Sequence, residues 1–179
     1  MLSAGWLVLA VVVAVLLSMW VTFTLTRLDR LHARVDAAWA ALDAQLVRRA
    51  AALQHAAESP ASGLADAGRG PCEDAARAAL AAQGDQDRQD AENAVGRMIA
   101  GLAGSAAELP PAAQDELREG SARVQVARRF YNDAVRDTRA LRARRMPRLL
   151  HLAGHRELPR FFDIDDSVAF APVPTKEGS

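Results

Sequence analysis

The chain has 179 residues, half of them hydrophobic, and its 22 basic and 22 acidic residues leave no formal net charge. This balance provides no general attraction to nucleic acid or to acidic substrates, so we expect no nucleic-acid partner. The single cysteine, Cys72, excludes an intrachain disulfide and a multi-cysteine metal site.

The N-terminal segment is apolar and uncharged. No side chain between Leu2 and Thr26 is ionisable. Twenty-five helical residues at about 1.5 Å each extend for about 37 Å, which exceeds the roughly 30 Å of a bilayer's hydrocarbon core. We therefore predict a transmembrane anchor over residues 1–26. The alternative, a cleaved signal peptide, would have a basic region before a shorter apolar core.

Basic residues follow the anchor, whereas no basic side chain precedes it. Arg27, Arg30 and Arg34 stand directly after the apolar segment. The positive-inside rule then predicts a single-pass protein of the cell membrane, with its N-terminus outside and its C-terminal domain in the cytoplasm.

The next residues continue a helical pattern. Residues 26–57 contain no Gly or Pro, and apolar residues recur there three or four positions apart. These residues are Leu28, Leu31, Val35, Trp39, Leu42, Leu46 and Leu53. We expect the anchor to run without a break into this helix. A loop rich in Pro and Gly follows over residues 59–71, and a second helical region over residues 73–105. If Gly84 interrupts that region, it forms two helices.

A third helix, beginning near Pro111, has the clearest periodicity. Its predicted buried row is Leu117, Gly120, Val124, Ala127, Tyr131, Ala134, Thr138 and Leu141, which alternate three and four apart as in a coiled coil. Phe130 and Val135 should widen that row. The predicted fold is all-α, a transmembrane helix that continues into a long antiparallel bundle of three or four helices. The bundle covers residues 27–166, and a disordered tail covers residues 167–179.

Two blocks of sequence resemble a known family. Residues 34–49 begin Arg-Val-Asp-Ala-Ala-Trp directly after the anchor, and residues 127–135 read Ala-Arg-Arg-Phe-Tyr-Asn-Asp-Ala-Val. Both blocks, in this order, are similar to the LemA family. The resemblance implies a bacterial single-pass membrane protein with a mostly cytoplasmic, antiparallel helical bundle. The matching residues of the second block are Arg128, Arg129, Phe130, Tyr131, Asn132 and Asp133.

The chain departs from the family pattern in two places. Residues 50–60 replace a Pro-Asn-Leu-Val type segment, and Phe161, Phe162 and Asp163 replace a Tyr-Phe-Glu type motif. The second change removes the tyrosine of the family motif. We expect Phe161, Phe162 and Ile164 to form a short clamp against the bundle.

No group of residues predicts a reaction. Tyr131 lies on the heptad row, so we interpret it as a core residue whose hydroxyl reaches a partner. Cys72 follows Pro71 at a predicted helix start, where the helix dipole would lower its thiol pKa, but no base accompanies it. His151 and His155 are four residues apart, so on a helix they would share one face, as two metal ligands can, but the sequence suggests no third ligand. We therefore predict no catalytic residue, no cofactor, no metal site and no enzymatic activity.

Arginines crowd the end of the third helix and the following segment. They are Arg136, Arg139, Arg142, Arg144, Arg145, Arg148, Arg156 and Arg160. They would suit anionic lipid headgroups if this end lies at the membrane, and they would equally suit a solvated helix C-terminus. The cluster is far from the membrane if residues 73–105 form one helix, and near it if Gly84 divides them. The candidate lipid or partner contacts are Arg142, Arg144, Arg145 and Arg148.

The expected function is protein–protein binding, as a scaffold or adaptor for other membrane-associated proteins. The alternative is a membrane-surface sensor or anionic-lipid-binding module that uses the arginine-rich segment 136–160. The sequence leaves homo-oligomerisation open.

Overall fold

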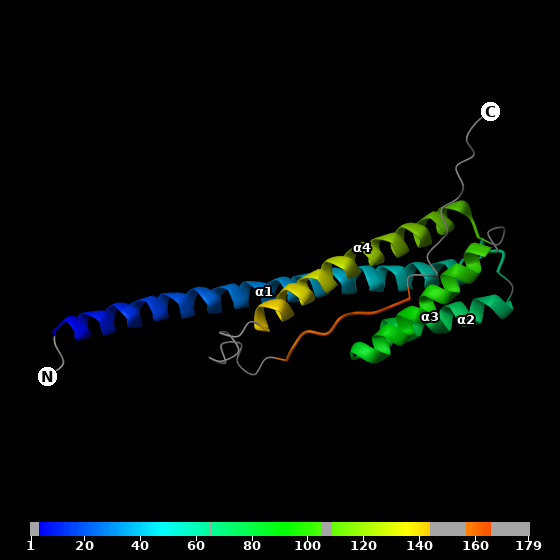
Figure 1. Ribbon diagram of the computed structural model, residues 1–179. Helices are drawn as coiled ribbons and strands as arrows, with labels where there is room; N and C mark the ends of the chain where they lie inside the picture. Colours follow the sequence, from blue (N-terminus) through cyan, green and yellow to red (C-terminus); the bar gives the residue numbers. More distant parts are fainter. Residues whose placement is uncertain (1–3, 65, 105–108, 144–156, 166–179) are drawn as a thin grey trace, which may run out of the picture. The chain divides into compact units, whose positions relative to one another are not determined.

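The described part of the chain forms four helices. The computed structural model describes residues 4–64, 66–104, 109–143 and 157–165, with the side chains of residues 66, 67 and 104 excepted. Helix α1 spans Ala4–Glu58, α2 Asp66–Ala81, α3 Asp85–Gly104 and α4 Pro111–Arg142 (Figure 1). No strand occurs within these ranges, so the predicted all-α class is confirmed.

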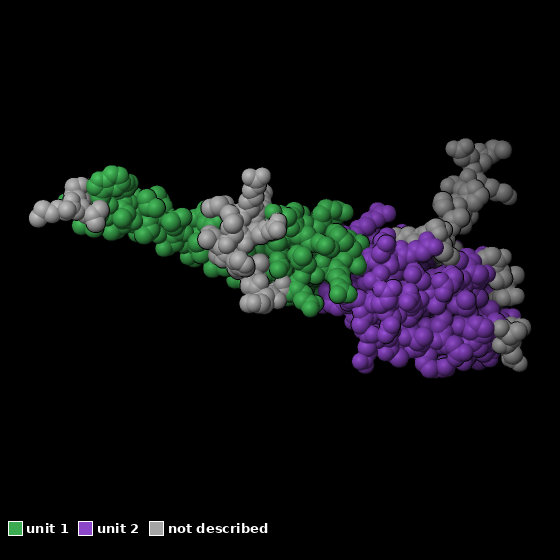
Figure 2. Space-filling model, turned by 60° about the horizontal axis from the view of Figure 1, so that its bottom comes forward, with its two compact units in different colours: residues 1–38, 131–161 green, residues 39–130, 162–179 purple. Residues whose placement is uncertain are grey.

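The chain divides into two compact units, coloured separately in Figure 2. Unit 1 contains residues 1–38 and 131–161, and unit 2 contains residues 39–130 and 162–179. Helices α1 and α4 each contribute to both units. The predicted boundaries at residues 26 and 166 remain predictions, and the predicted tail at residues 167–179 lies outside the described residues.

The N-terminal part of α1 is long and apolar enough to cross a membrane. Its large side chains, including Trp6, Val11 and Leu16, are exposed. The hydroxyls in this part donate to helix carbonyls four residues earlier: Ser18 to Ala14 at 2.8 Å and Thr22 to Ser18 at 2.9 Å. These bonds satisfy hydroxyl groups that would have no water to bind in the hydrocarbon core of a bilayer. The predicted continuity is confirmed, since α1 has no break before Glu58.

The core of unit 2 receives residues from all four helices. It includes Leu53 of α1, Ala76 of α2, Ile99 of α3 and Leu117 of α4. Many other core positions are alanine, namely Ala50, Ala52, Ala56, Ala57 and Ala79. Small side chains let helices approach closely. A Cβ atom added to Gly120 of α4 would lie 3.9 Å from the Arg49 Cα of α1.

The predicted heptad row of α4 is mostly buried. Leu117, Val124, Tyr131, Ala134, Thr138 and Leu141 are buried, and Gly120 and Ala127 are partly buried. Val135 is also buried, as expected. Phe130 is 65% exposed, so its predicted place in the buried stripe is wrong. At about 100° per residue, Phe130 and Val135 flank the row on opposite sides, and α4 is covered only on the Val135 side.

The predicted loop at residues 59–71 is too long. Helix α2 already begins at Asp66, and Pro71 lies inside it. Proline there removes one helix hydrogen bond, which the buried side chains of Cys72, Ala76 and Ala79 compensate. The second helical region divides at Gly84, one of the two predicted alternatives, because Gly84 adopts a φ of +88°.

We expect Gly84→Ala to lower the free energy of unfolding by about 1–2 kcal/mol, because a Cβ atom disfavours positive φ. Nothing lies within 4 Å of the added Cβ, so the effect is backbone strain alone. The measurement is chemical denaturation of the detergent-solubilised chain, followed by circular dichroism. The matched control is Gly96→Ala within α3, which also has open space and should stabilise by up to about 1 kcal/mol. Equal effects at both positions would contradict the prediction.

Candidate functional site

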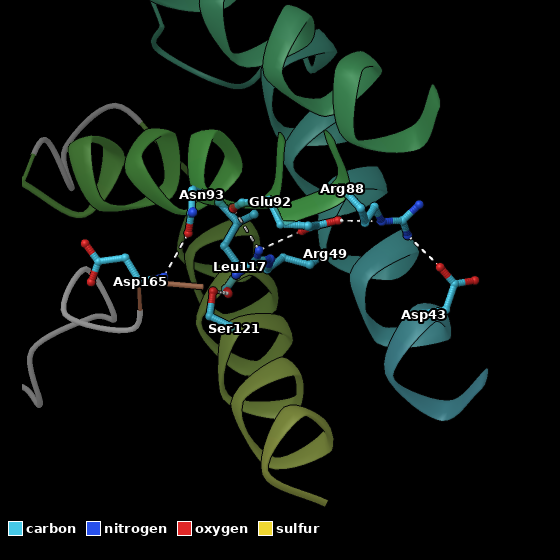
Figure 3. Close-up of polar contacts among 8 residues, drawn as sticks. All are labelled: Asp43, Arg49, Arg88, Glu92, Asn93, Leu117, Ser121 and Asp165. Carbon is cyan, nitrogen blue, oxygen red and sulfur yellow. Dashed lines mark hydrogen bonds and ion pairs between the residues drawn. The ribbon is translucent and has the colours of Figure 1, made fainter. Parts of the chain in front are cut away.

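An ion pair in the interior of unit 2 joins α1 to α3. Nη2 of Arg49 lies 2.7 Å from Oε2 of Glu92, and the side chains are only 7% and 0% exposed. The same Nη2 donates to the Glu92 carbonyl oxygen at 3.1 Å. Figure 3 shows both side chains reaching toward each other from their helices. The guanidinium therefore binds a side chain and a backbone group of one residue.

A second arginine extends this pair toward the surface. Nε of Arg88, one helical turn before Glu92, lies 3.4 Å from Oε1 of Glu92. Its Nη2 lies 2.7 Å from Oδ1 of Asp43 on α1 (Figure 3). Two arginines thus face two carboxylates, and the formal charges cancel. The arrangement fixes how α3 lies along α1, because a shift of either helix would leave a buried charge without its partner.

Burial raises the pKa of Glu92, although the nearby Arg49 and Arg88 act in the opposite direction. The carboxyl is enclosed by protein, and its closest partners are the guanidinium groups of two arginines. The network is therefore suited to holding helices together.

An extended segment, residues 157–165, binds unit 2 through its last residues. The backbone N–H of Asp163 donates to Oε1 of Gln89 at 3.2 Å, and that of Asp165 donates to Oδ1 of Asn93 at 2.8 Å. Gln89 and Asn93 are one turn apart on α3, so their side-chain amide oxygens accept bonds from two successive alternate residues of the segment. Figure 3 shows the Asn93–Asp165 contact beside the ion-pair network.

At the alternate positions 162 and 164, the segment inserts apolar side chains. Phe162 is buried, and its ring meets that of Trp39 edge-on, with centroids 5.6 Å apart. Ile164 is buried as well. The predicted clamp is confirmed for these two residues. Phe161, by contrast, is 41% exposed, and in unit 1 its ring lies 5.2 Å from the Arg139 guanidinium carbon.

Tyr131 behaves as the sequence predicts. It is buried in unit 1, and its hydroxyl donates to the Arg160 carbonyl oxygen at 2.8 Å. Nη1 of Arg142 donates to the Glu157 carbonyl oxygen at 3.2 Å. Two side chains of α4 therefore hold the first part of the extended segment through its backbone.

The other residues of the family block do not gather into one polar site. Arg128 is half-buried and lies 3.7 Å from Asp163 in unit 2. Arg129 and Phe130 are exposed, and Asn132 is partly buried. Asp133 forms an exposed pair with Arg136 at 2.6 Å. The block thus spreads its side chains around α4.

Three described arginines of the predicted cluster have contacts within unit 1: Arg136 with Asp133, Arg139 with the Phe161 ring and Arg142 with the Glu157 carbonyl oxygen. In the same part of α4, Asp137 lies 3.3 Å from Arg34 of α1. Arg144, Arg145, Arg148 and Arg156 lie outside the described residues, as do His151 and His155.

The chemistry of Cys72 differs from the prediction. Cys72 lies within α2 and not at its start, and burial raises its thiol pKa, with Glu73 adding to the effect. The predicted lowering of the pKa by the helix dipole is therefore wrong. Across the described ranges, no cluster of three or more His, Cys, Asp or Glu side chains could hold a metal ion.

The exposed surface of α4 carries an apolar pair that lies outside the predicted contact residues 142–148. Val126 and Phe130 are one turn apart and are 52% and 65% exposed. Arg129 is exposed beside them. Exposed aromatic residues next to arginine are typical of protein-binding surfaces. The sequence signal that marks this pair is the spacing of four between two apolar residues on the polar face of α4.

A shallow groove of about 380 Å³ lies along the contact between α1 and α4 in unit 2. Its charged lining comes from Arg48, Glu116 and Arg123, and Gly120 forms part of the wall. Arg123 also pairs with Glu119. The mixed charges of the lining favour no single class of small ligand.

We found no match between this chain and protein-family models, curated proteins or solved structures.

Glu92→Gln should lower the free energy of unfolding by about 3 kcal/mol, because it leaves the buried Arg49 without a counter-charge. Denaturant unfolding measures this loss. The control is Asp74→Asn, which removes an exposed pair with Arg77. That change should cost less than about 0.5 kcal/mol.

The same variant also tests the raised pKa of Glu92. Above the ordinary value of 4.5, the folded state retains a proton that the unfolded chain releases, so the stability that Glu92 contributes falls as pH rises through the folded pKa. Glu92→Gln should remove this part of the pH dependence. An unchanged pH profile would contradict the raised pKa.

Proposed function

We propose that this chain is a membrane-anchored helical-bundle protein of the LemA type, which acts by binding other membrane-associated proteins as a scaffold or adaptor. It is a binding protein and not an enzyme. The family resemblance of residues 34–49 and 127–135 supports the assignment. In the proposed topology, the N-terminus is outside the cell and the helices after residue 26 are cytoplasmic, as Arg27, Arg30 and Arg34 favour.

An antiparallel bundle is supported by contacts between α1 and α4 in each unit. In unit 2, Gly120 lies against Arg49, and in unit 1, Asp137 pairs with Arg34. The residue number on α4 rises as the number on α1 falls. This is the order expected of two helices that run in opposite directions.

The observation that carries the adaptor function is the exposed pair Val126 and Phe130. Leaving a phenylalanine ring in water has a cost of about 1.5–3 kcal/mol relative to burying it. Within the described residues, no other part of the chain covers the Phe130 ring. A partner that covers the pair would recover that free energy, and Arg129 could add hydrogen bonds at the edge of the contact.

A photoreactive amino acid at position 130 or 126 should cross-link a defined partner in native membranes. The control position is Glu119, on the same exposed side of α4 but about 16 Å away from Phe130 along the helix. Phe130→Ala should abolish cross-linking from position 126 without changing the thermal midpoint, because the ring is exposed. Equal cross-linking from positions 119 and 130 would reject the pair as a specific surface.

The alternative function, a module that binds anionic lipid, is favoured by the Arg34–Asp137 pair. Arg34 is eight residues beyond Thr26, about 12 Å along α1, and Arg142 is five residues beyond Asp137, about 7.5 Å along α4. In an antiparallel pair of helices, Arg142 then comes within about 5 Å of the level where the uncharged segment ends. The C-terminal end of α4 would then lie near the headgroups.

Replacing Arg142, Arg144, Arg145 and Arg148 with Gln should weaken binding to vesicles that contain anionic lipid, since each charge near the surface contributes about 1 kcal/mol. Flotation of the full chain, with its anchor covered by a non-ionic amphipol, measures the binding. A control with Arg77, Arg97, Arg118 and Arg123 replaced by Gln has the same change in net charge. If both variants bind equally, the alternative is wrong.

A further inference from the structure

A second heptad row runs along α1, and it is exposed over its whole length. We call it the alanine seam. Its members alternate four and three apart, and they are Ala33, Ala37, Ala40, Ala44, Val47 and Ala51. At about 100° per residue, this row lies on the side of α1 opposite the buried row that contains Val35, Leu42 and Leu46. Helix α1 therefore has two apolar rows, and the other helices cover one of them.

Charges flank the alanine seam in a regular order. One side carries Asp29, Asp36 and Asp43. The other side carries Arg27, Arg34 and Arg48, with Ala41 at the remaining position. In heptad terms these are the g and e positions, where charges decide which helices pair and in which orientation.

The charge order distinguishes between the two orientations of a paired copy. In a parallel dimer, each g residue faces the e residue five positions further along the other helix. Asp29 then faces Arg34, and Asp43 faces Arg48. In an antiparallel dimer, g faces g and e faces e, so aspartates would oppose aspartates and arginines would oppose arginines.

We propose that the alanine seam is the interface of a parallel homodimer, in which the second copy of the chain packs its own seam against α1. The proposal rests on the proposed membrane anchor. Two copies anchored through the same segment of one bilayer have the same direction and the same height. The anchor thus imposes the parallel, in-register arrangement that the charges favour.

The contacts of each chain leave room for this pairing. Asp43 also binds Arg88, and Arg34 also binds Asp137, yet their side chains remain 44% and 58% exposed. Within the described residues, Asp29 and Arg48 form no ion pair. Alanines bury little area, but they permit helix axes to approach to about 8 Å. Confinement to the bilayer raises the effective concentration, so a weak interface suffices.

Cysteine cross-linking of the full chain in isolated membranes tests the dimer. Ala40→Cys and Ala44→Cys place thiols on the seam, and Ala78→Cys on α2 and Ala122→Cys on α4 are exposed controls. The native Cys72 is buried, so the unmodified chain serves as the blank. Mild oxidation should form several-fold more disulfide-linked dimer at the seam positions than at the controls. Equal yields at all four positions, or none at the seam, would overturn the proposal.

Charge exchange tests the orientation. Arg48→Asp, combined with Ala44→Cys, should reduce the dimer yield, because Asp43 of one copy then faces an aspartate. Co-expression with a chain that carries Asp43→Arg and Ala44→Cys should restore it as a mixed dimer. Arg48→Asp breaks no described ion pair, so a reduced yield at an unchanged thermal midpoint supports the proposal even if Asp43→Arg does not fold. An unchanged yield would overturn it.

Alkaline carbonate extraction of the same membranes tests the anchor separately. A chain that remains in the membrane but does not cross-link at Ala40 and Ala44 refutes the dimer alone. A chain that is extracted, yet still cross-links there, refutes the anchor and supports the seam.

Discussion

The fold depends on α1 remaining helical from Ala4 to Glu58, because this helix joins the apolar N-terminal segment to residues of both units. Its side chains at residues 4–19 are exposed, and this part is suited to a bilayer, where backbone groups must bond within the helix. Its second half supplies Leu46 and Leu53 to a core formed with α2, α3 and α4. A break near residue 38 would separate the apolar segment from the core that follows it.

The buried Arg49–Glu92 pair adds specificity to this scaffold. Nearly half of the described core residues are alanine, so fewer large side chains fix one helix against another, and small residues permit several alignments at similar free energy. A buried ion pair excludes the other alignments, because a shift of either helix would leave a buried ion without its partner, which is strongly destabilising. Arg88 and Asp43 continue the constraint to the surface. Gln89 and Asn93, each one residue beyond Arg88 and Glu92, then accept the bonds that attach the extended segment to α3.

Local periodicity is sufficient to predict α1 and the buried row of α4, because both patterns repeat over many turns. It does not predict on which side that row widens, since this depends on where other helices lie, and the pattern alone therefore places Phe130 in the core. Pro71 suggests a loop, although packing of Cys72 and Ala76 maintains the helix. The Arg49–Glu92 pair joins residues 43 positions apart. Its only local signal is a charged residue in the apolar row of Leu42, Leu46 and Leu53.

The attachment of α3 to residues 162–165 has a consequence for natural variation. Gln89 and Asn93 accept hydrogen bonds from backbone N–H groups, which every residue except proline possesses. The attachment to α3 itself should therefore survive almost any exchange other than proline at positions 163 and 165 in homologous chains. Positions 162 and 164 bury their side chains and should remain large and apolar. Along the extended segment, positions that accept many residue types should thus alternate with positions that accept only large apolar ones. The same alternation is found in an edge strand with one buried face.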